Sequence, residues 1–353
     1  MTGIVLYENG GFVTLQGDSL LTATIGIDQT SSLPILNTKI TGNRAVVGQC
    51  QKIVVLSSDL LYAWSGSLNE VIKVHSCLQQ AVSMTKDDYL YFTKKLIDEN
   101  INRDLSLIIV RRFEDKSSLV LSKLSIGRSN LPGYGDIYYG GSGQGSLFGE
   151  MGDLFGNIPD HLAMINGPKH ISDRVQRIRL MDSILETRFL FHKTIDVNMG
   201  GALETIVLYP SKPFSKIDNS LYAIWSTELL CPDNLFPVIL VKRFYLDGYL
   251  CVSLYNYRTK TVKTSMVPNP GNYKDKHIDK NIDWNPLAGS IGMVSCVYLR
   301  GVLGIRHYLE DADTFKRHFR YDNLTGRVLC SKAYRDDYLL RCGGGAPINF
   351  SNL

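Results

Sequence analysis

The chain has 353 residues, of which 44% are hydrophobic and 20% charged, and its formal net charge is +4. This composition is typical of a globular protein with a sizeable core, and so small a charge excess argues against a nucleic-acid partner. No stretch approaches 18 consecutive apolar residues, so we expect no membrane span. The seven cysteines are irregularly spaced, and the start of the chain lacks a basic signal region. These features predict a reduced, cytoplasmic protein.

Hydrophobic patterning predicts blocks of strands and helices over residues 1–210. Asn9-Gly10 is a strong two-residue turn signal and predicts a hairpin, whereas the polar residues 24–44 predict a connection or an inserted loop. The expected elements, in order, are strands at 4–7, 12–15, 52–57 and 60–66, helices at 67–80 and 86–99, strands at 105–113 and 117–126, helices near 144–155 and 172–193, and a strand at 203–209. This order suits an α+β fold of two stacked sheets with helices outside each, a four-layer αββα sandwich.

A proline-containing segment, residues 210–213, interrupts this pattern and predicts a domain boundary. Beyond it, apolar runs rich in β-branched and aromatic residues predict strands, with a hairpin turn at residues 246–248. A Lys- and Asp-rich stretch at 271–283 predicts a loop. We therefore expect two domains, residues 1–210 and a C-terminal, mostly β domain of residues 211–353, whose role the sequence does not indicate.

Thr2 is a candidate nucleophile, because an initiator methionine is normally removed before a small residue. The chain would then begin with a threonine whose own α-amine can accept the proton of its hydroxyl. A Met-Thr start alone carries no catalytic meaning, but Asp18 and Lys52 supply suitable charges nearby in the predicted strands. A lysine ammonium favours the deprotonated hydroxyl, and an aspartate keeps that ammonium charged. The alternatives are a turn cap for Asp18 and a solvated strand-end charge for Lys52.

The spacing of these residues resembles that of the proteasome β subunits and the related bacterial HslV peptidase, which are N-terminal nucleophile (Ntn) hydrolases. In that family sixteen residues separate nucleophile and aspartate, as they separate Thr2 and Asp18 here. The family's lysine lies fourteen residues before the glycine of a serine-glycine turn, which matches Lys52 and Gly66. Lys39 lies nearer to Asp18 but fails this second spacing. The resemblance implies that the Gly66 N–H donates to an oxyanion; a plain strand end is the alternative.

Two later motifs continue the resemblance, which covers residues 2–210 and no part of 211–353. The phrase GGSGQG implies that Ser142 bonds the N-terminal amine, and TIDVNMGGALETIVL implies that Asp196 orients Ser142 and the amine. At the family's second serine this chain has Met199, which cannot provide that hydrogen bond. The amine would then be held less firmly, or through water.

The resemblance also implies a substrate pocket. The residue two before the oxyanion glycine forms the pocket floor in the related peptidases, and here it is Trp64, with Leu68 and Thr22 as further lining. So large a floor predicts a preference for small side chains or for a non-peptide acyl group. Packing of Trp64 in the sheet interface is the alternative.

The function implied is that of a threonine peptidase or amidohydrolase that cleaves a peptide or protein substrate through an acyl ester on Thr2. An amine acceptor in place of water would make the same acyl-enzyme a transamidase or peptide ligase. The non-enzymatic alternative is a weakened proteasome-like binding or assembly module, which Met199 favours mildly. This chemistry needs no cofactor, and the histidines show no metal-ligand spacing. Residues 211–353 would obstruct ring packing, so we expect a monomer or self-association into a small oligomer.

Overall fold

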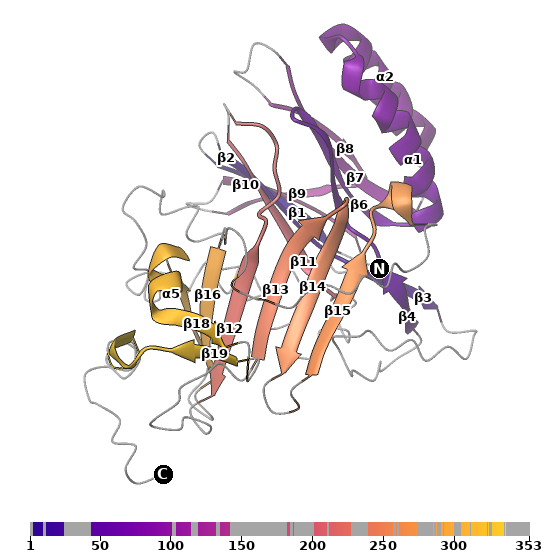
Figure 1. The fold of residues 1–353 in the computed structure, drawn as a ribbon. Helices are drawn as coiled ribbons and strands as arrows, with labels where there is room; N and C mark the ends of the chain where they lie inside the picture. The colour runs from indigo at the N-terminus through magenta and orange to yellow at the C-terminus, as the bar shows by residue number, and fades with distance from the viewer. Residues whose placement is uncertain are drawn as a thin grey trace.

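The protein is described by a computed structural model, which forms a mixed α+β fold dominated by antiparallel strands (Figure 1). The residues it describes are 3–9, 12–24, 44–100, 104–113, 119–131, 135–141, 182, 183, 186, 201–209, 212–226, 239–256, 259, 261–273, 285, 287, 291, 293–299, 305–310, 312–322, 324, 327–334 and 336. Within them the strands belong to five sheets. The expected mixture of strands and helices is confirmed at this level.

Two antiparallel sheets are built from the first two hundred residues. The five-stranded sheet has the order β11-β2-β1-β10-β9, and the four-stranded sheet has the order β5-β6-β7-β8. The bounds in the first are β1 Ile4–Asn9, β2 Phe12–Asp18, β9 Gly127–Leu131, β10 Gly135–Gly140 and β11 Leu203–Leu208. Those in the second are β5 Ile53–Ser57, β6 Leu60–Gly66, β7 Leu105–Arg112 and β8 Leu119–Leu124. The hairpins predicted at the start of the chain and around residue 58 are both present.

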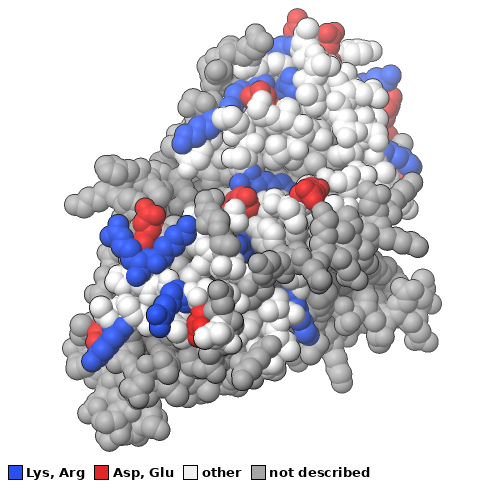
Figure 2. All heavy atoms as spheres, viewed as in Figure 1, with Lys and Arg blue, Asp and Glu red and all other residues white. Residues whose placement is uncertain are grey.

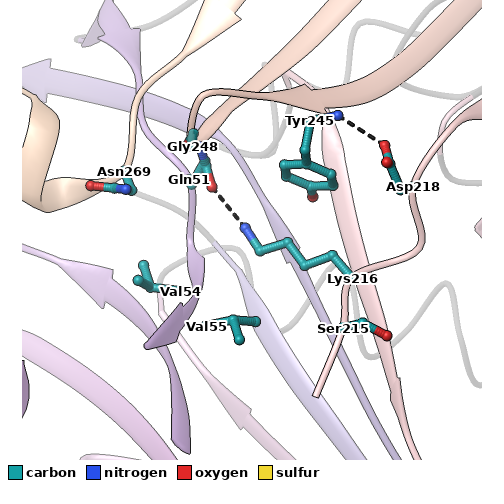
Figure 3. A pocket seen from close by; sticks show the side chains of 9 residues that line it. All are labelled: Gln51, Val54, Val55, Ser215, Lys216, Asp218, Tyr245, Gly248 and Asn269. Atoms are coloured by element: carbon teal, nitrogen blue, oxygen red, sulfur yellow. Dashed lines mark hydrogen bonds between the residues drawn. The ribbon is translucent and has the colours of Figure 1, made fainter. Parts of the chain in front are cut away.

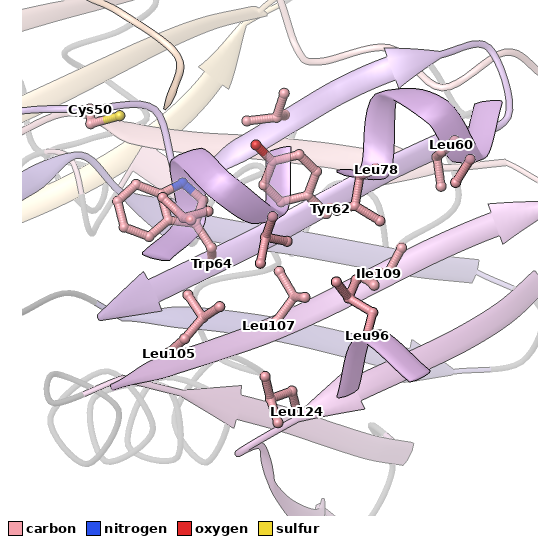
Figure 4. Packing of buried hydrophobic residues seen from close by; sticks show 14 of the residues in the cluster. Cys50, Leu60, Tyr62, Trp64, Leu78, Leu96, Leu105, Leu107, Ile109 and Leu124 are labelled. Atoms are coloured by element: carbon pink, nitrogen blue, oxygen red, sulfur yellow. The ribbon is translucent and has the colours of Figure 1, made fainter. Parts of the chain in front are cut away.

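The two sheets pack face to face because successive side chains of a strand point to opposite faces. Leu61 and Ala63 of β6 lie in a core with Ile4 and Leu15 of the other sheet. On the opposite face of the four-stranded sheet, a second core forms beneath helices α1 (Leu68–Gln80) and α2 (Lys86–Asn100) (Figure 4). A short 3₁₀ helix, η1 (Ala81–Ser83), joins the helices. Helices, sheet and sheet thus make three successive layers.

The helices expected near 144–155 and 172–193, which would supply a fourth layer, lie almost wholly outside the described residues. Of that range Asp182, Ser183 and Glu186 are described, and all three are helical. Their side chains are buried, and Asp182 accepts a hydrogen bond from the Thr205 hydroxyl of β11. These residues therefore pack on the five-stranded sheet.

The C-terminal residues form a six-stranded sheet of order β15-β14-β13-β12-β16-β17, in which β12 and β16 are parallel and all other neighbours antiparallel. The strands are β12 Ser220–Ser226, β13 Ile239–Leu246, β14 Tyr249–Asn256, β15 Thr261–Val267, β16 Met293–Leu299 and β17 Ile305–Glu310. One face is covered by α5 (Ala312–His318) and the hairpin of β18 (Phe319–Asp322) and β19 (Arg327–Cys330). The other face packs on Ala202, just before β11, so the sheet is joined closely to the first half of the chain (Figure 1).

Several elements were not predicted. The ends of the expected 24–44 connection are strands, since β3 (Leu20–Thr24) pairs with β4 (Arg44–Gln49); residues 25–43 lie outside the description. The expected loop at 271–283 begins inside a 3₁₀ helix, η4 (Pro270–Asn272), that packs on α1. Strands β9 and β10 were also missed, because their Gly-, Ser- and Tyr-rich segments lack an apolar alternation.

Charged side chains are dispersed over the visible surface. On the face shown in Figure 2, basic and acidic groups are interspersed among uncharged residues, as the small net charge of +4 leads one to expect. Among the helices that the structure describes, none combines the length and apolar character needed to cross a membrane.

Candidate functional site

The predicted catalytic residues divide into two groups. Asp18, Lys52 and Gly66 are described: Asp18 ends β2, Lys52 directly precedes β5, and Gly66 ends β6. Thr2, Ser142, Asp196 and the neighbouring Met199 lie outside the described residues, and Thr22 is described only as backbone in β3. Their predicted roles stay predictions.

Asp18 is a buried carboxylate at the end of β2, directly beside the start of β1. The backbone N–H of Gly3 donates to its Oδ1 at 3.1 Å, and its own N–H donates to the Gly3 carbonyl at 3.3 Å. On the other side, Asp18 is the register partner of Leu203 in β11. The carboxylate is 1% exposed and is therefore desolvated. Its contact is with Gly3, the residue that follows the predicted nucleophile Thr2 in the chain.

Lys52 reaches the same place from the segment before β5. A Cβ added to Gly17 would lie 3.1 Å from the Cβ of Lys52, so a glycine in β2 permits the lysine backbone to approach. The Lys52 Nζ lies 3.5 Å from the ring centroid of Trp64 and, among the described residues, has no hydrogen-bond acceptor. Lysines are almost never fully buried unless they are paired, and Lys52 is 0% exposed.

The electrostatics of Lys52 follow from this burial. Desolvation lowers the pKa of Lys52 to about 8, against the opposing influence of Cys50, Asp18 and Glu204, which raise it. Burial likewise raises the pKa of the Cys50 thiol to about 12. The thiol is thus neutral at neutral pH, while the lysine stays cationic but close to its titration range. Perturbed groups of this kind are typical of functional sites.

Gly66 ends β6 with a left-handed backbone, φ +106°. A Cβ at this position would lie 2.4 Å from the Asp104 carbonyl oxygen, a contact no other residue tolerates. The glycine is therefore required by the turn from β6 into α1, whose N-cap is Ser67. That requirement holds independently of the predicted oxyanion role.

The described pocket residues lie in the core beneath α1. Trp64 is 0% exposed, and its indole Nε1 donates to the Gln51 carbonyl at 2.9 Å. Leu68, the first residue of α1, is partly buried against the same cluster. Trp64 packs between the four-stranded sheet and α1 (Figure 4), and not between the two sheets; its role as a pocket floor stays a prediction.

A buried ion pair not foreseen from the sequence holds the Lys52 segment. The Glu204 Oε2 of β11 accepts hydrogen bonds from the backbone N–H groups of Lys52 at 2.6 Å and of Ile53 at 3.2 Å. Its Oε1 accepts from the Lys216 Nζ at 2.5 Å and from the Tyr245 hydroxyl at 3.2 Å. Both carboxylate oxygens are thus used, one toward Lys52 and one toward the C-terminal half.

Gln51 completes this connection. Its backbone N–H donates to the Pro268 carbonyl at 2.8 Å, and its side-chain amide donates to the carbonyls of Gly248 at 2.7 Å and Val267 at 2.8 Å. The amide oxygen in turn accepts from the Lys216 Nζ at 2.7 Å (Figure 3). The segment that presents Lys52 is therefore fastened to the C-terminal sheet as well as to β11.

A pocket of about 360 Å³ opens beside this connection (Figure 3). Gln51, Lys216 and Tyr245 form part of its wall, with Val54 and Asp218. The Lys216 Nζ is already bonded to Glu204 and Gln51, and Asp218 accepts the Tyr245 N–H at 2.9 Å. These polar groups are thus engaged within the protein, and the pocket has no clear binding chemistry of its own.

A second buried charge network lies between β11, the helical residues near 182 and the C-terminal sheet. Arg243 of β13 pairs with Asp182 at 2.7 Å and with Glu186 at 3.5 Å, and it donates to the Leu203 carbonyl. The Tyr222 hydroxyl donates to Asp182 at 2.5 Å. Desolvation raises the pKa of Glu186 to about 7 despite the opposing influence of Arg243. The Arg243 guanidinium thus faces the carboxyl groups of both Asp182 and Glu186. The raised pKa of Glu186 means that this carboxyl group is partly protonated at neutral pH.

Sequence reasoning missed Glu204, Gln51, Lys216 and Arg243. One available signal was Glu204 itself, a charged residue inside the apolar run ALETIVLY, since a carboxylate within a buried strand requires partners. The identity of those partners had no local signal, because Lys216 and Gln51 come from segments far apart in the chain.

Comparisons with known proteins add no relatives. No protein-family model matches the chain, and a search of curated proteins finds no match. Within the described part of the chain, no group of three or more His, Cys, Asp or Glu residues is placed to hold a metal ion. The function proposed below rests on the motifs and on the geometry of Asp18 and Lys52.

Proposed function

We propose that the protein is an N-terminal threonine amidohydrolase or peptidase, with Thr2 as its nucleophile. The observation that carries this proposal is the buried Lys52 ammonium beside Asp18. It is fully desolvated and lacks a hydrogen-bond acceptor among the described residues, while the Asp18 carboxylate accepts the N–H of Gly3, the residue after Thr2. A charge buried at such a cost is most readily explained by a function.

Chain connectivity supports the grouping of the remaining residues. Ile4 is the register partner of Gly140. Thr2 comes two residues before Ile4 in the chain, and Ser142 comes two residues after Gly140. Two residues span at most about 7 Å, so we propose that both lie at the same end of these two strands. We propose that the two hydroxyl groups meet there.

The segment that carries Asp196 ends at the same place. Gly201 has a φ of +85°, and its Cα lies so close to Ser19 that an added Cβ would be 2.5 Å from the serine Oγ. The Ala202 N–H donates to that oxygen at 2.8 Å. Residues 201 and 202 are thus fixed beside Asp18, and Asp196 precedes Gly201 by only five positions.

The four-layer αββα sandwich belongs to the same proposal. Three layers are described, namely α1 with α2, the four-stranded sheet and the five-stranded sheet. The helical Asp182, Ser183 and Glu186 lie against β11 on the five-stranded sheet. We propose that they belong to the second helical layer, which completes an Ntn hydrolase fold.

The proposed reaction follows from these groups. The Thr2 oxygen attacks the substrate carbonyl while the α-amine takes the hydroxyl proton, and the Lys52 ammonium stabilises the oxygen as it gains negative charge. The Gly66 N–H donates to the oxyanion of the tetrahedral intermediate. The C–N bond then breaks, the amine product leaves with the proton, and an ester remains on Thr2. Attack by water releases the acid and regenerates the threonine.

Covalent trapping tests the proposal. The full-length protein is incubated with a peptide epoxyketone, which reacts with a threonine hydroxyl and its neighbouring free amine, and the adduct is located by peptide mass spectrometry. We expect the adduct on Thr2, its absence from Thr2→Ala, and a strongly reduced labelling rate for Lys52→Met. Lys94→Met, at an exposed position of α2, serves as the control and should label like the wild type. Retention of Met1 on the native protein, or no adduct in the wild type, would contradict the proposal.

A ligase is the second candidate function, and the C-terminal sheet favours it. This sheet binds the segment before β5 through Gln51, and Lys52 is shielded from water. A site that excludes water lets an amine compete for the acyl ester. Adding amine acceptors to a turnover assay and weighing the products decides between the two: new amide products indicate a ligase, and free acid alone indicates a hydrolase.

A further inference from the structure

The backbone of Lys52 is held by a side chain that the proposed mechanism does not use. Glu204 lies on β11 with 0% exposure, and its Oε2 accepts the N–H of Lys52 at 2.6 Å and of Ile53 at 3.2 Å. Two N–H groups that converge on one carboxylate oxygen fix the peptide between them. Glu204 therefore fixes the position of the backbone from which the Lys52 side chain extends.

The orientation of Glu204 is fixed in turn from the C-terminal half. The Lys216 Nζ donates to its Oε1 at 2.5 Å and also to the Gln51 Oε1 at 2.7 Å. Lys216 is held in place because its backbone forms an isolated antiparallel β-bridge with Ile206 of β11. The Tyr245 hydroxyl of β13 adds a further hydrogen bond to the same Oε1.

We infer that Glu204 is a positioning residue for Lys52 and that Lys216 holds Glu204 in the orientation this requires. The inference rests on the proposed role of Lys52 in activating Thr2. It assigns a part in the site to residues 211–353, which the resemblance to known peptidases does not cover. Removing the carboxylate would leave the Lys52 N–H without its acceptor and would allow the Lys52 backbone to shift. Catalysis is sensitive to such small displacements of a reacting group.

The alternative is a merely structural ion pair, and two double variants separate it from positioning. Glu204→Gln with Lys216→Met removes both charges but keeps a side-chain oxygen for the Lys52 N–H. Glu204→Leu with Lys216→Met removes both charges and the acceptor. Replacing both members of a buried pair by uncharged residues avoids a lone buried charge, so the two variants differ mainly in the hydrogen bonds to Lys52 and Ile53.

The reactivity of Thr2 is measured in both variants as the labelling rate with the epoxyketone, and kcat and KM are measured with an ester substrate. We expect the leucine variant to have a kcat roughly 10- to 100-fold below that of the glutamine variant, with an unchanged KM, because substrate contacts are not touched. The same two substitutions in the exposed Lys95–Glu99 pair of α2 should change neither constant. Equal kcat values in the two folded variants would overturn the inference.

Glu204→Asp covers the case in which the leucine variant does not fold. Aspartate keeps the charge and the pairing with Lys216, but its side chain is shorter by one methylene and cannot serve both Lys216 and the Lys52 N–H. A similar loss in kcat at unchanged KM is expected, and an unchanged kcat would count against positioning. An inert wild type would contradict the proposed function itself, whereas an active wild type with insensitive variants contradicts only the role of Glu204.

Discussion

Replacing Lys52 by methionine should make the protein more stable while it removes the proposed activity. Burial lowers the pKa of Lys52 from its ordinary 10.5 to about 8. At about 1.4 kcal/mol per tenfold change in proton binding, this displacement means that holding the charged lysine in the fold costs about 3 kcal/mol at neutral pH. Methionine has a similar length, keeps contact with the Trp64 ring and needs no hydrogen-bond partner. Lys52→Met should therefore raise the free energy of unfolding by about 3 kcal/mol at pH 7.

The pH dependence of this gain has a definite sign. Between pH 8 and pH 10.5 the folded wild type binds fewer protons at Lys52 than the unfolded chain does, so its stability rises with pH over this window. The advantage of Lys52→Met should accordingly be complete below pH 8 and should vanish as the pH approaches 10.5. Urea denaturation of both proteins at pH 7, 8, 9 and 10 measures it, with equal m-values as the test that the two transitions are comparable.

The same substitution at Lys216 provides the matched control. Lys216 is largely buried too, with 10% of its side chain exposed, but it is paired with Glu204 at 2.5 Å. Lys216→Met therefore leaves a buried carboxylate without its cation. Breaking such a pair typically costs about 3–5 kcal/mol, and the change should be destabilising. A Lys52→Met protein that is less stable than the wild type at pH 7, or a gain that does not change with pH, would refute the view that Lys52 is retained at the expense of stability.

Two further predictions concern the neighbouring elements. Burial raises the pKa of Glu186 to about 7, so between the ordinary pKa of a glutamate and pH 7 the folded state binds more protons than the unfolded state. The stability of the wild type relative to Glu186→Gln should therefore fall by about 3 kcal/mol as the pH rises through this range. Denaturation of both proteins at pH 4.5 and 8 measures the change. Gly201→Ala should destabilise the protein by about 1–3 kcal/mol or more, because it combines a positive φ with a contact to Ser19. Gly248→Ala, with a similar φ of +81° but only ordinary van der Waals contacts for the new Cβ, at 3.7 Å from Asn272 and 3.8 Å from Asn269, should cost less in the same thermal unfolding assay, and equal costs would rule out the contact.

Local features of the fold were predictable from local signals. The β1–β2 hairpin follows from Asn9-Gly10, and α1 and α2 follow from their apolar spacing and, for α1, from the N-cap Ser67. Strands β9 and β10 had no such signal. β10 is held by pairing with β1, whose Ile4–Glu8 matches Gly140–Asp136 residue by residue, and β9 is held by pairing with β10. Such pairing depends on tertiary context more than on propensity.

The candidate site was predictable only in part, for a related reason. Asp18 and Lys52 are found by spacing, and the fold places both at the start of β1. The residues that hold Lys52 cannot be found in this way, because a buried charge selects its partner by distance in space. Glu204 thus bonds a backbone N–H about 150 positions earlier in the chain, and no periodicity or motif connects the two.

The predicted domain boundary at residue 210 is crossed by several buried polar contacts. A boundary between independent domains should cross few polar contacts, yet the buried bonds of Gln51, Glu204 and Arg243 all join the two sides. Each leaves a buried charge or amide unsatisfied if either side is removed, and such groups cost several kcal/mol. The C-terminal sheet is therefore part of the structure that keeps a lone lysine desolvated beside Asp18. In a protein whose proposed activity depends on that lysine, the sheet belongs to the site as much as the strands that carry it.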